Sequence, residues 1–153
     1  MASHQGTYVL RFEGDVRLTL CVAFDGYLRN MFGDPDFQAV VVDLCNAKGI
    51  DSTSLGLLAK LAKESQSHTH KAPLLACDNN DIRRSLESVG IDHLFEPAAS
   101  IPSEAVSLGT LNETDASEAE TREQVLAAHR ELMSLNPENA AAFKDLVAKL
   151  EAI

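Results

Sequence analysis

Residues 39–61, AVVVDLCNAKGIDSTSLGLLAKL, join a valine-rich apolar run to a cluster of hydroxyl side chains and then to a second apolar segment. The run at residues 39–44 has the pattern of a strand that is buried on both faces. After an expected loop at residues 45–50, leucine and alanine recur at steps of three and four residues, which predicts a helix from about Ser52 to about Ser67. A buried strand followed by such a helix indicates an α/β domain.

The segment before this stretch also contains strand and helix patterns. Residues 7–12 alternate apolar and polar side chains like a half-buried strand, and Glu13-Gly14-Asp15 is expected to form a turn. Two predictions then compete: a second short strand at residues 16–20, and a helix whose apolar residues recur from Leu18 to Phe32. The sequence leaves both open.

A second unit of strand and helix follows the first. Residues 74–77 predict another buried strand, residues 78–81 offer N-cap side chains for an amphipathic helix, and Gly90 is placed to end that helix. Consecutive units of this kind imply right-handed crossovers. The expected fold is therefore α/β, with a mixed, mainly parallel sheet flanked by helices.

The last part of the chain has a different pattern. Ser117 begins a possible capping box for a helix that runs to about Leu135, and Asn136-Pro137 is an N-cap followed by proline at the first helical position. We expect a domain at residues 1–100, a linker at 101–112 and a C-terminal helical hairpin at 113–153. Two short helices are marginal alone, so the hairpin should pack on the domain, on another copy or on a partner.

Composition narrows the class of partner. The chain has 153 residues, 45% of them hydrophobic, and 23 acidic against 13 basic side chains give a net charge of -10. This charge disfavours phosphate backbones and anionic lipid, so we expect a protein partner, with no nucleic acid and no membrane. The N-terminus lacks a secretory pattern and no apolar run reaches membrane-spanning length, which predicts a cytoplasmic protein.

Neither the cysteines nor the paired histidines predict a metal site. Cys21, Cys45 and Cys77 match no paired-cysteine spacing and are interpreted as small buried hydrophobes. His68 and His70 lack a nearby acid or thiol, which is typical of a solvated helix end. No metal and no other cofactor is expected.

The hydroxyl cluster has two interpretations. Asp51, Ser52, Thr53 and Ser54 precede an apolar helix, where a side-chain oxygen can cap the free N–H groups of the first turn. One cap is enough, however, and Gly56 costs about 1 kcal/mol of helix propensity, which indicates a surface built for close approach. A phosphoryl group at this helix start would add about -1.5 to -2 charges and change what can dock there.

A hydrolase would use the same residues differently. Asp51 or Ser52 would be the nucleophile, and Asp43 and Asp78 could gather nearby at the carboxyl ends of parallel strands. No histidine or lysine base stands at a recognisable spacing, and neither a glycine-rich phosphate loop nor a GxSxG motif is present. We therefore expect the protein not to be an enzyme.

The order of five segments carries a family resemblance. TYVLRF, AVVVDL, IDSTSLGLL, PLLAC and NNDIRRSLESVGIDHLF follow one another within residues 7–97. In this order they resemble the STAS domain of bacterial anti-sigma factor antagonists. In that family a strand ending in Asp-Leu precedes an Ile/Met-Asp-Ser-Ser/Thr segment that opens a helix. Here Asp43-Leu44 precede Ile50-Asp51-Ser52-Thr53, with Leu55-Gly56 in the expected places.

The resemblance implies a partner-switching regulator. Such a protein binds an anti-sigma factor that is also a serine-protein kinase and so frees a sigma factor; phosphorylation by that kinase releases it, and a PP2C-type phosphatase, in some bacteria part of a response regulator, restores binding. The phospho-acceptor of the family falls on Ser52. Ser54 stands where many members have glycine, which adds a third hydroxyl. The implied partner-binding residues are Asp51, Ser52, Thr53, Ser54, Gly56 and Leu57.

Two questions stay open on the sequence. The runner-up function is a ligand-binding or scaffold STAS module that is never phosphorylated and in which Ser52 only caps the helix. The C-terminal hairpin lies outside the resemblance. It could cover an apolar edge or helix groove of the domain, or serve as a second docking surface.

Overall fold

The computed structural model describes residues 2–4, 6–17, 21–98, 106–107 and 117–152 of the chain, and of these the side chains at positions 2–4, 21–22 and 106–107 are not described. The elements in chain order are β1 (Ala2–His4), β2 (Thr7–Val16), α1 (Cys21–Phe32), β3 (Ala39–Ile50), α2 (Ser52–Thr69), β4 (Leu74–Ala76), α3 (Asn80–Ser88), the short 3-10 helix η2 (Ile91–Leu94), β5 (Glu96–Pro97), β6 (Val106–Ser107), α4 (Glu118–Met133) and α5 (Pro137–Glu151).

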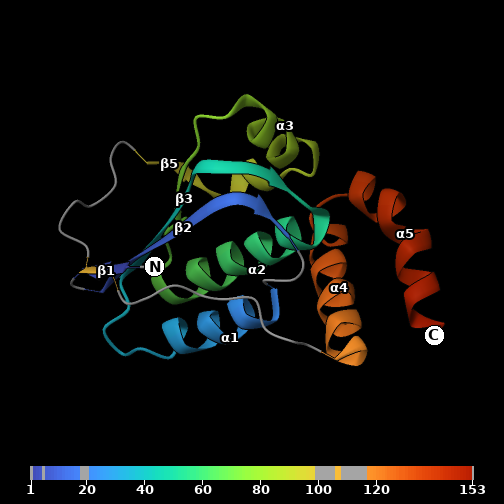
Figure 1. Ribbon diagram of the computed structural model, residues 1–153, viewed down its shortest axis with the longest axis horizontal. Helices are drawn as coiled ribbons and strands as arrows, with labels where there is room; N and C mark the ends of the chain where they lie inside the picture. Colours follow the sequence, from blue (N-terminus) through green and yellow to red (C-terminus); the bar gives the residue numbers. More distant parts are fainter. Residues whose placement is uncertain (1, 5, 18–20, 99–105, 108–116, 153) are drawn as a thin grey trace.

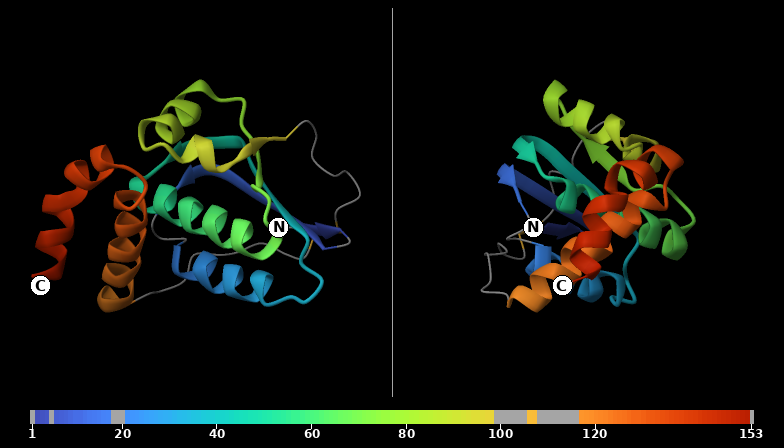
Figure 2. Two further views of the ribbon diagram at one scale, coloured as in Figure 1. Left: turned by 180° about the vertical axis from the view of Figure 1, so that it is seen from behind. Right: turned by 90° about the vertical axis from the view of Figure 1, so that its right-hand side faces the viewer.

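Within these residues the strands form one sheet in the order β5-β4-β3-β2-β1-β6. β2, β3, β4 and β5 run parallel to one another, whereas β1 pairs antiparallel with both β2 and β6. Figures 1 and 2 show α1 and α2 side by side against the sheet, and α4 and α5 beyond one end of α2. The predicted α/β class with a mixed, mainly parallel sheet is confirmed.

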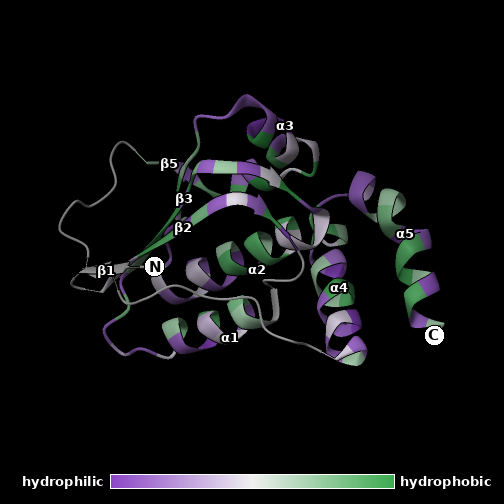
Figure 3. Ribbon diagram, in the orientation of Figure 1, coloured by the Kyte–Doolittle hydropathy of each residue, from purple (hydrophilic) through white to green (hydrophobic). Residues whose placement is uncertain are grey.

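The central strands supply the core. Side chains on alternate positions of β2 and β3 face the helices, because successive residues of a strand point to opposite faces. These side chains and those of α2 belong to one buried apolar cluster, whose strand members include Leu10, Phe12, Val40, Val42 and Leu44. Figure 3 shows apolar residues along α2 and also along α5. Residues 40–44 of β3 are buried in succession, so this part of the strand is covered on both faces, as the valine-rich run predicted.

Two predictions around β2 and β3 are wrong. Glu13-Gly14-Asp15 does not form a turn, since β2 continues to Val16, with one register shift just before Glu13 and another between Gly14 and Asp15. Gly14 has a φ of 68°, a left-handed conformation that irregular pairing requires. The expected loop at residues 45–50 is the second half of β3, which pairs with this irregular end of β2. Pairing between strands overrode the local turn signal.

The structure also differs from the sequence-based expectations for the start of α1 and for the burial of β4. α1 begins at Cys21, so the helix interpretation holds from that residue onward, while residues 18–20, where the strand and helix predictions competed, lie outside the described part. β4 is half-buried rather than buried. It adjoins β5, which is only Glu96–Pro97, and so short an edge strand covers little of it.

The predicted helix ends are confirmed. Asn79 caps α3 by accepting hydrogen bonds from two backbone N–H groups, and Gly90 follows that helix with a φ of 79°. Ser117 caps α4, and Asn136 caps α5 with Pro137 in its first turn. These signals are local, because a cap needs only a side chain within one helical turn of the groups it satisfies.

A tyrosine at the start of β2 gives a prediction for alkaline pH. The Tyr8 hydroxyl donates a hydrogen bond to the Asp34 carboxylate. This bond, together with burial and the negative charge of Asp34, raises the pKa of Tyr8 to about 12. Because the folded pKa is raised, the contact stabilises the fold below the ordinary tyrosine pKa of about 10 and loses its contribution as the pH rises towards about 12.

We expect a phenolate absorbance titration of the folded protein to show Tyr8 ionising near pH 12. In Asp34→Asn its midpoint should fall, because the acceptor loses its charge. Tyr27, whose pKa is raised by burial alone, serves as the internal reference and should not move. An unchanged Tyr8 midpoint in Asp34→Asn would contradict the assignment, and Tyr8→Phe identifies which transition is which.

Candidate docking site at the start of α2

The start of α2 is defined by Asp51. This residue has an extended backbone, and its carboxylate accepts a hydrogen bond of 2.8 Å from the backbone N–H of Ser54. Ser52 is therefore the first residue inside the helix, and the runner-up idea that Ser52 caps α2 is wrong. With the cap supplied by Asp51, the Ser52 hydroxyl is available for another contact.

The three hydroxyl side chains differ in exposure. Thr53 and Ser54 are buried, with 5% and 4% of their surface exposed, whereas Ser52 is half-buried. The Ser54 hydroxyl turns inward and donates to the backbone carbonyl of Val16 at 3.4 Å. Ser52 is thus the most accessible hydroxyl of the cluster, which favours it over Thr53 and Ser54 as an acceptor for a modifying group.

The Ser52 hydroxyl contacts a histidine from the far end of the sequence. Its Oγ lies 2.8 Å from Nε2 of His129 on α4, a residue that is only 1% exposed. The other ring nitrogen, Nδ1, lies 2.7 Å from the carbonyl oxygen of Val125. A carbonyl can only accept, so Nδ1 carries a proton, and in the neutral ring Nε2 accepts the Ser52 proton. The Ser52 hydroxyl is therefore engaged by α4 of the same chain.

Gly56 lies directly beneath α4. A Cβ atom placed on Gly56 would be 2.1 Å from the carbonyl oxygen of Ala128 and 2.7 Å from its Cα. Any side chain other than hydrogen would therefore push α4 away. The close approach that the sequence indicated at Gly56 exists, and the element that approaches is the chain's own helix.

The six expected partner-binding residues are not equally placed. Asp51 and Ser52 are half-exposed, and Gly56 is buried under α4. Leu57 is 4% exposed and lines a small apolar cavity with Phe12 and Phe24, so it faces the interior of the domain. Only the outer part of the predicted docking surface is open to solvent while α4 is seated.

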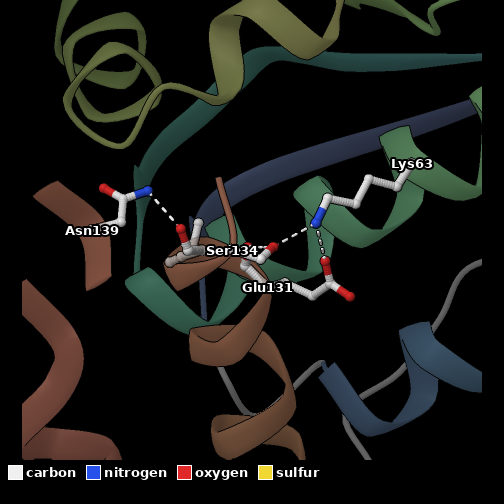
Figure 4. Close-up of polar contacts among 5 residues, drawn as sticks. Lys63, Glu131, Ser134 and Asn139 are labelled. Atoms are coloured by element: carbon white, nitrogen blue, oxygen red, sulfur yellow. Dashed lines mark hydrogen bonds and ion pairs between the residues drawn. The ribbon is translucent and has the colours of Figure 1, made fainter. Parts of the chain in front are cut away.

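Side chains near the C-terminal end of α4 fix its position. Lys63 on α2 donates to Glu131 at 2.8 Å and to Ser134 at 2.6 Å, as Figure 4 shows. Asn139 on α5 is buried, and its amide nitrogen donates to the carbonyls of Val89 and Leu132, at 2.8 Å each. Leu132 is fully buried in the apolar core of the domain. The helices therefore pack on the domain, the first of the three possibilities that the sequence left open, and α4 covers α2.

Sequence reasoning missed His129. The signal that could have found it is its position in an apolar stripe of α4, three residues after Leu126 and three before Leu132, which are both buried. An inward-facing histidine in a helix with many charged residues needs a hydrogen-bond partner. The partner itself could not be identified from the sequence, because Ser52 lies 77 residues earlier.

Asp43, one of the acidic residues that a hydrolase would gather, is engaged away from Asp51. Asp43 lies seven residues before the end of β3, and its carboxylate pairs with Arg11 at 2.9 Å. Burial acts to raise the pKa of Asp43, but hydrogen bonds from Cys45 and Arg11 outweigh it, and the net shift is downward. Asp43 is thus a charged group held within the sheet and separated along β3 from Asp51.

The cysteines and histidines offer no alternative centre in the part of the chain that the structure describes. Cys45 and Cys77 are free and half-buried rather than buried, and burial together with Asp43 raises the pKa of the Cys45 thiol to about 11. His68 stacks on Phe32 at the end of α2. Among the described residues no group of three His, Cys, Asp or Glu side chains could hold a metal ion.

No helix in the described ranges is long and apolar enough to cross a membrane.

The fold and this site together define the class of protein. The molecule is an α/β domain with a mainly parallel sheet, in which a hydroxyl cluster opens the helix after the central strand. The family model of the STAS domain matches residues 1–104, so the chain belongs to the STAS domain family. A comparison with curated proteins found no match. α4 and α5 lie outside the matched residues.

Proposed function

We propose that this STAS protein is an anti-sigma factor antagonist that works by partner switching. In its unphosphorylated form it binds an anti-sigma factor that is also a serine-protein kinase. Phosphorylation of Ser52 by that kinase ends binding, and a PP2C-type phosphatase, alone or within a response regulator, restores it. The protein acts in the cytoplasm as a non-enzymatic regulator, and its net charge of -10 argues against nucleic acid as the partner.

The observation that carries the proposal is the position of Ser52. It is the first residue of α2, beside the Asp51 cap, and the most exposed of three consecutive hydroxyl residues. The first N–H groups of a helix have no partner within the helix and, with the helix dipole, stabilise an added anion. A phosphoryl group on Ser52 would leave the core intact while placing new negative charge on the surface that a partner must contact.

The contact between Ser52 and His129 also has the outline of a nucleophile and its base. We assign it a structural role. The histidine is oriented by the carbonyl of Val125 rather than by a carboxylate, and α4 packs onto α2 one helical turn away, at Gly56.

Intact-mass measurement after incubation with the anti-sigma kinase and ATP tests the proposal. The wild-type chain should gain one phosphoryl group and Ser52→Ala none. Thr53→Val and Ser54→Ala are the matched controls and should be phosphorylated like wild type, because both hydroxyls are buried. Phosphorylation that persists in Ser52→Ala would reject Ser52 as the acceptor. A wild-type chain left unmodified by a kinase that phosphorylates a control substrate would favour the ligand-binding or scaffold alternative.

A further inference from the structure

We propose that the hairpin of α4 and α5 is an intramolecular occupant of the docking surface on α2, and that the partner binds by replacing α4 with a helix of its own. This inference rests on the proposed function, because it concerns the same surface. Ser52 and Gly56 lie one turn apart on α2, and both are in contact with α4, through His129 and Ala128. A partner that reaches these two residues cannot do so while α4 is seated.

The shape of this surface specifies what can occupy it. Because the backbone of α4 touches Gly56, the surface accepts a helix at backbone distance, provided that a small residue such as Ala128 faces the glycine. Lys63 lies about two turns after Gly56 on the same face of α2, and it pairs with an acidic side chain of the occupant, Glu131. The surface therefore fits a partner helix that places a small residue opposite Gly56 and an acidic residue opposite Lys63.

The way the hairpin is attached allows it to leave as a unit. Its polar contacts with the domain include those made by the side chains of His129, Glu131, Ser134, Asn136 and Asn139. Its apolar anchor in the core is Leu132, with Leu135 and Phe143 packed against the same cluster. Residues 113–153 carry 9 acidic and 4 basic side chains, and residues 1–112 carry 14 and 9, so the two regions have net charge of the same sign. Like charge weakens their association.

Occupation by α4 lowers the apparent affinity of any partner for α2. The partner binds only the fraction of molecules in which the hairpin is released, so its apparent dissociation constant rises by the inverse of that fraction. The same fraction limits how fast a kinase can reach the Ser52 hydroxyl. The hairpin thus sets the threshold at which the partner binds.

The first measurement follows release of the hairpin without any partner. Leu132→Asp places a charge at a fully buried position on the hairpin and leaves α2 unchanged. Amide hydrogen exchange of residues 118–133 should become at least about 10-fold faster, since local opening is what exchange reports, while exchange in β3 stays as in wild type. His129→Ala is the milder second variant, and it replaces Leu132→Asp if that chain does not fold. If exchange in β3 rises together with that in α4, the hairpin does not leave separately and the inference is wrong.

The second measurement asks what the freed surface accepts. The probe is a fluorescent peptide of residues 117–153 added to the full chain. It should bind Leu132→Asp but not wild type, whose site is filled. Adding Gly56→Ala to Leu132→Asp should weaken peptide binding at least about 10-fold, whereas adding Gly26→Ala should not. Gly26 is the matched control, since it lies in a helix and a Cβ atom placed there meets nothing within 4 Å. Equal binding to both double variants would overturn the proposed contact.

The third measurement tests whether the partner binds the same surface of α2 that α4 covers. The anti-sigma kinase should displace the peptide from Leu132→Asp and should bind this variant more tightly than wild type. If the kinase binds while the peptide remains in place, the inference fails and the proposed function stands. If the kinase neither binds any variant nor phosphorylates Ser52, the proposed function fails and this inference about the partner fails with it.

Discussion

Ser52→Asp is expected to weaken binding of the anti-sigma kinase by at least about 100-fold. A carboxylate at this position adds negative charge beside Asp51, at a surface where an imposed like charge or an unpaired charge costs several kcal/mol. Each 1.4 kcal/mol corresponds to a factor of ten in the dissociation constant. Isothermal titration calorimetry with the unphosphorylated protein measures this change.

Ser52→Ala should bind at least as tightly as wild type. It cannot be phosphorylated, and it removes the proton that His129 accepts, which leaves a buried ring nitrogen unpaired and favours release of α4. Ser67→Asp is the matched control, because it adds the same charge to an exposed position near the other end of α2. If the dissociation constants of Ser52→Asp and Ser67→Asp were both within about threefold of the wild-type value, charge at Ser52 would not control docking.

Leu61→Ala is expected to lower the free energy of unfolding by about 2–5 kcal/mol. Leu61 is fully buried where α2 packs on the sheet, so the substitution leaves a cavity in the centre of the core. Urea denaturation followed by circular dichroism measures the loss. Leu146→Ala, on the 39% exposed Leu146, is the control and should change stability by no more than about 0.5 kcal/mol.

Leu132→Ala removes the same atoms from another fully buried position and should behave differently. Because the hairpin can open before the domain unfolds, the loss at Leu132 appears first as faster amide exchange in α4, and the urea transition of the sheet shifts less than in Leu61→Ala. Equal shifts in both variants would mean that the hairpin unfolds together with the domain, which argues against its separate release.

Most of the fold could be predicted from the sequence, because the patterns that indicate strands, helices and helix ends are local or repeat along the chain. The buried run at residues 39–44 gave the central strand, and the caps at Asn79, Ser117 and Asn136 marked helix starts that the structure contains. The errors at residues 13–15 and 45–50 have one cause. Both segments pair with each other, and a turn signal in one strand cannot report that a distant strand satisfies its backbone hydrogen bonds.

The candidate site was likewise predictable only in part from the sequence. The order of Asp51, Ser52 and Gly56 before an apolar helix was enough to indicate a helix start built for close contact, because capping and glycine effects act within a turn or two of the backbone. What makes that contact was decided by tertiary structure alone. His129 and Ala128 reach α2 because Leu132, buried in the core, holds α4 in place. Such packing depends on complementary surfaces far apart in the chain, so no local pattern could have shown that the helix start is already occupied.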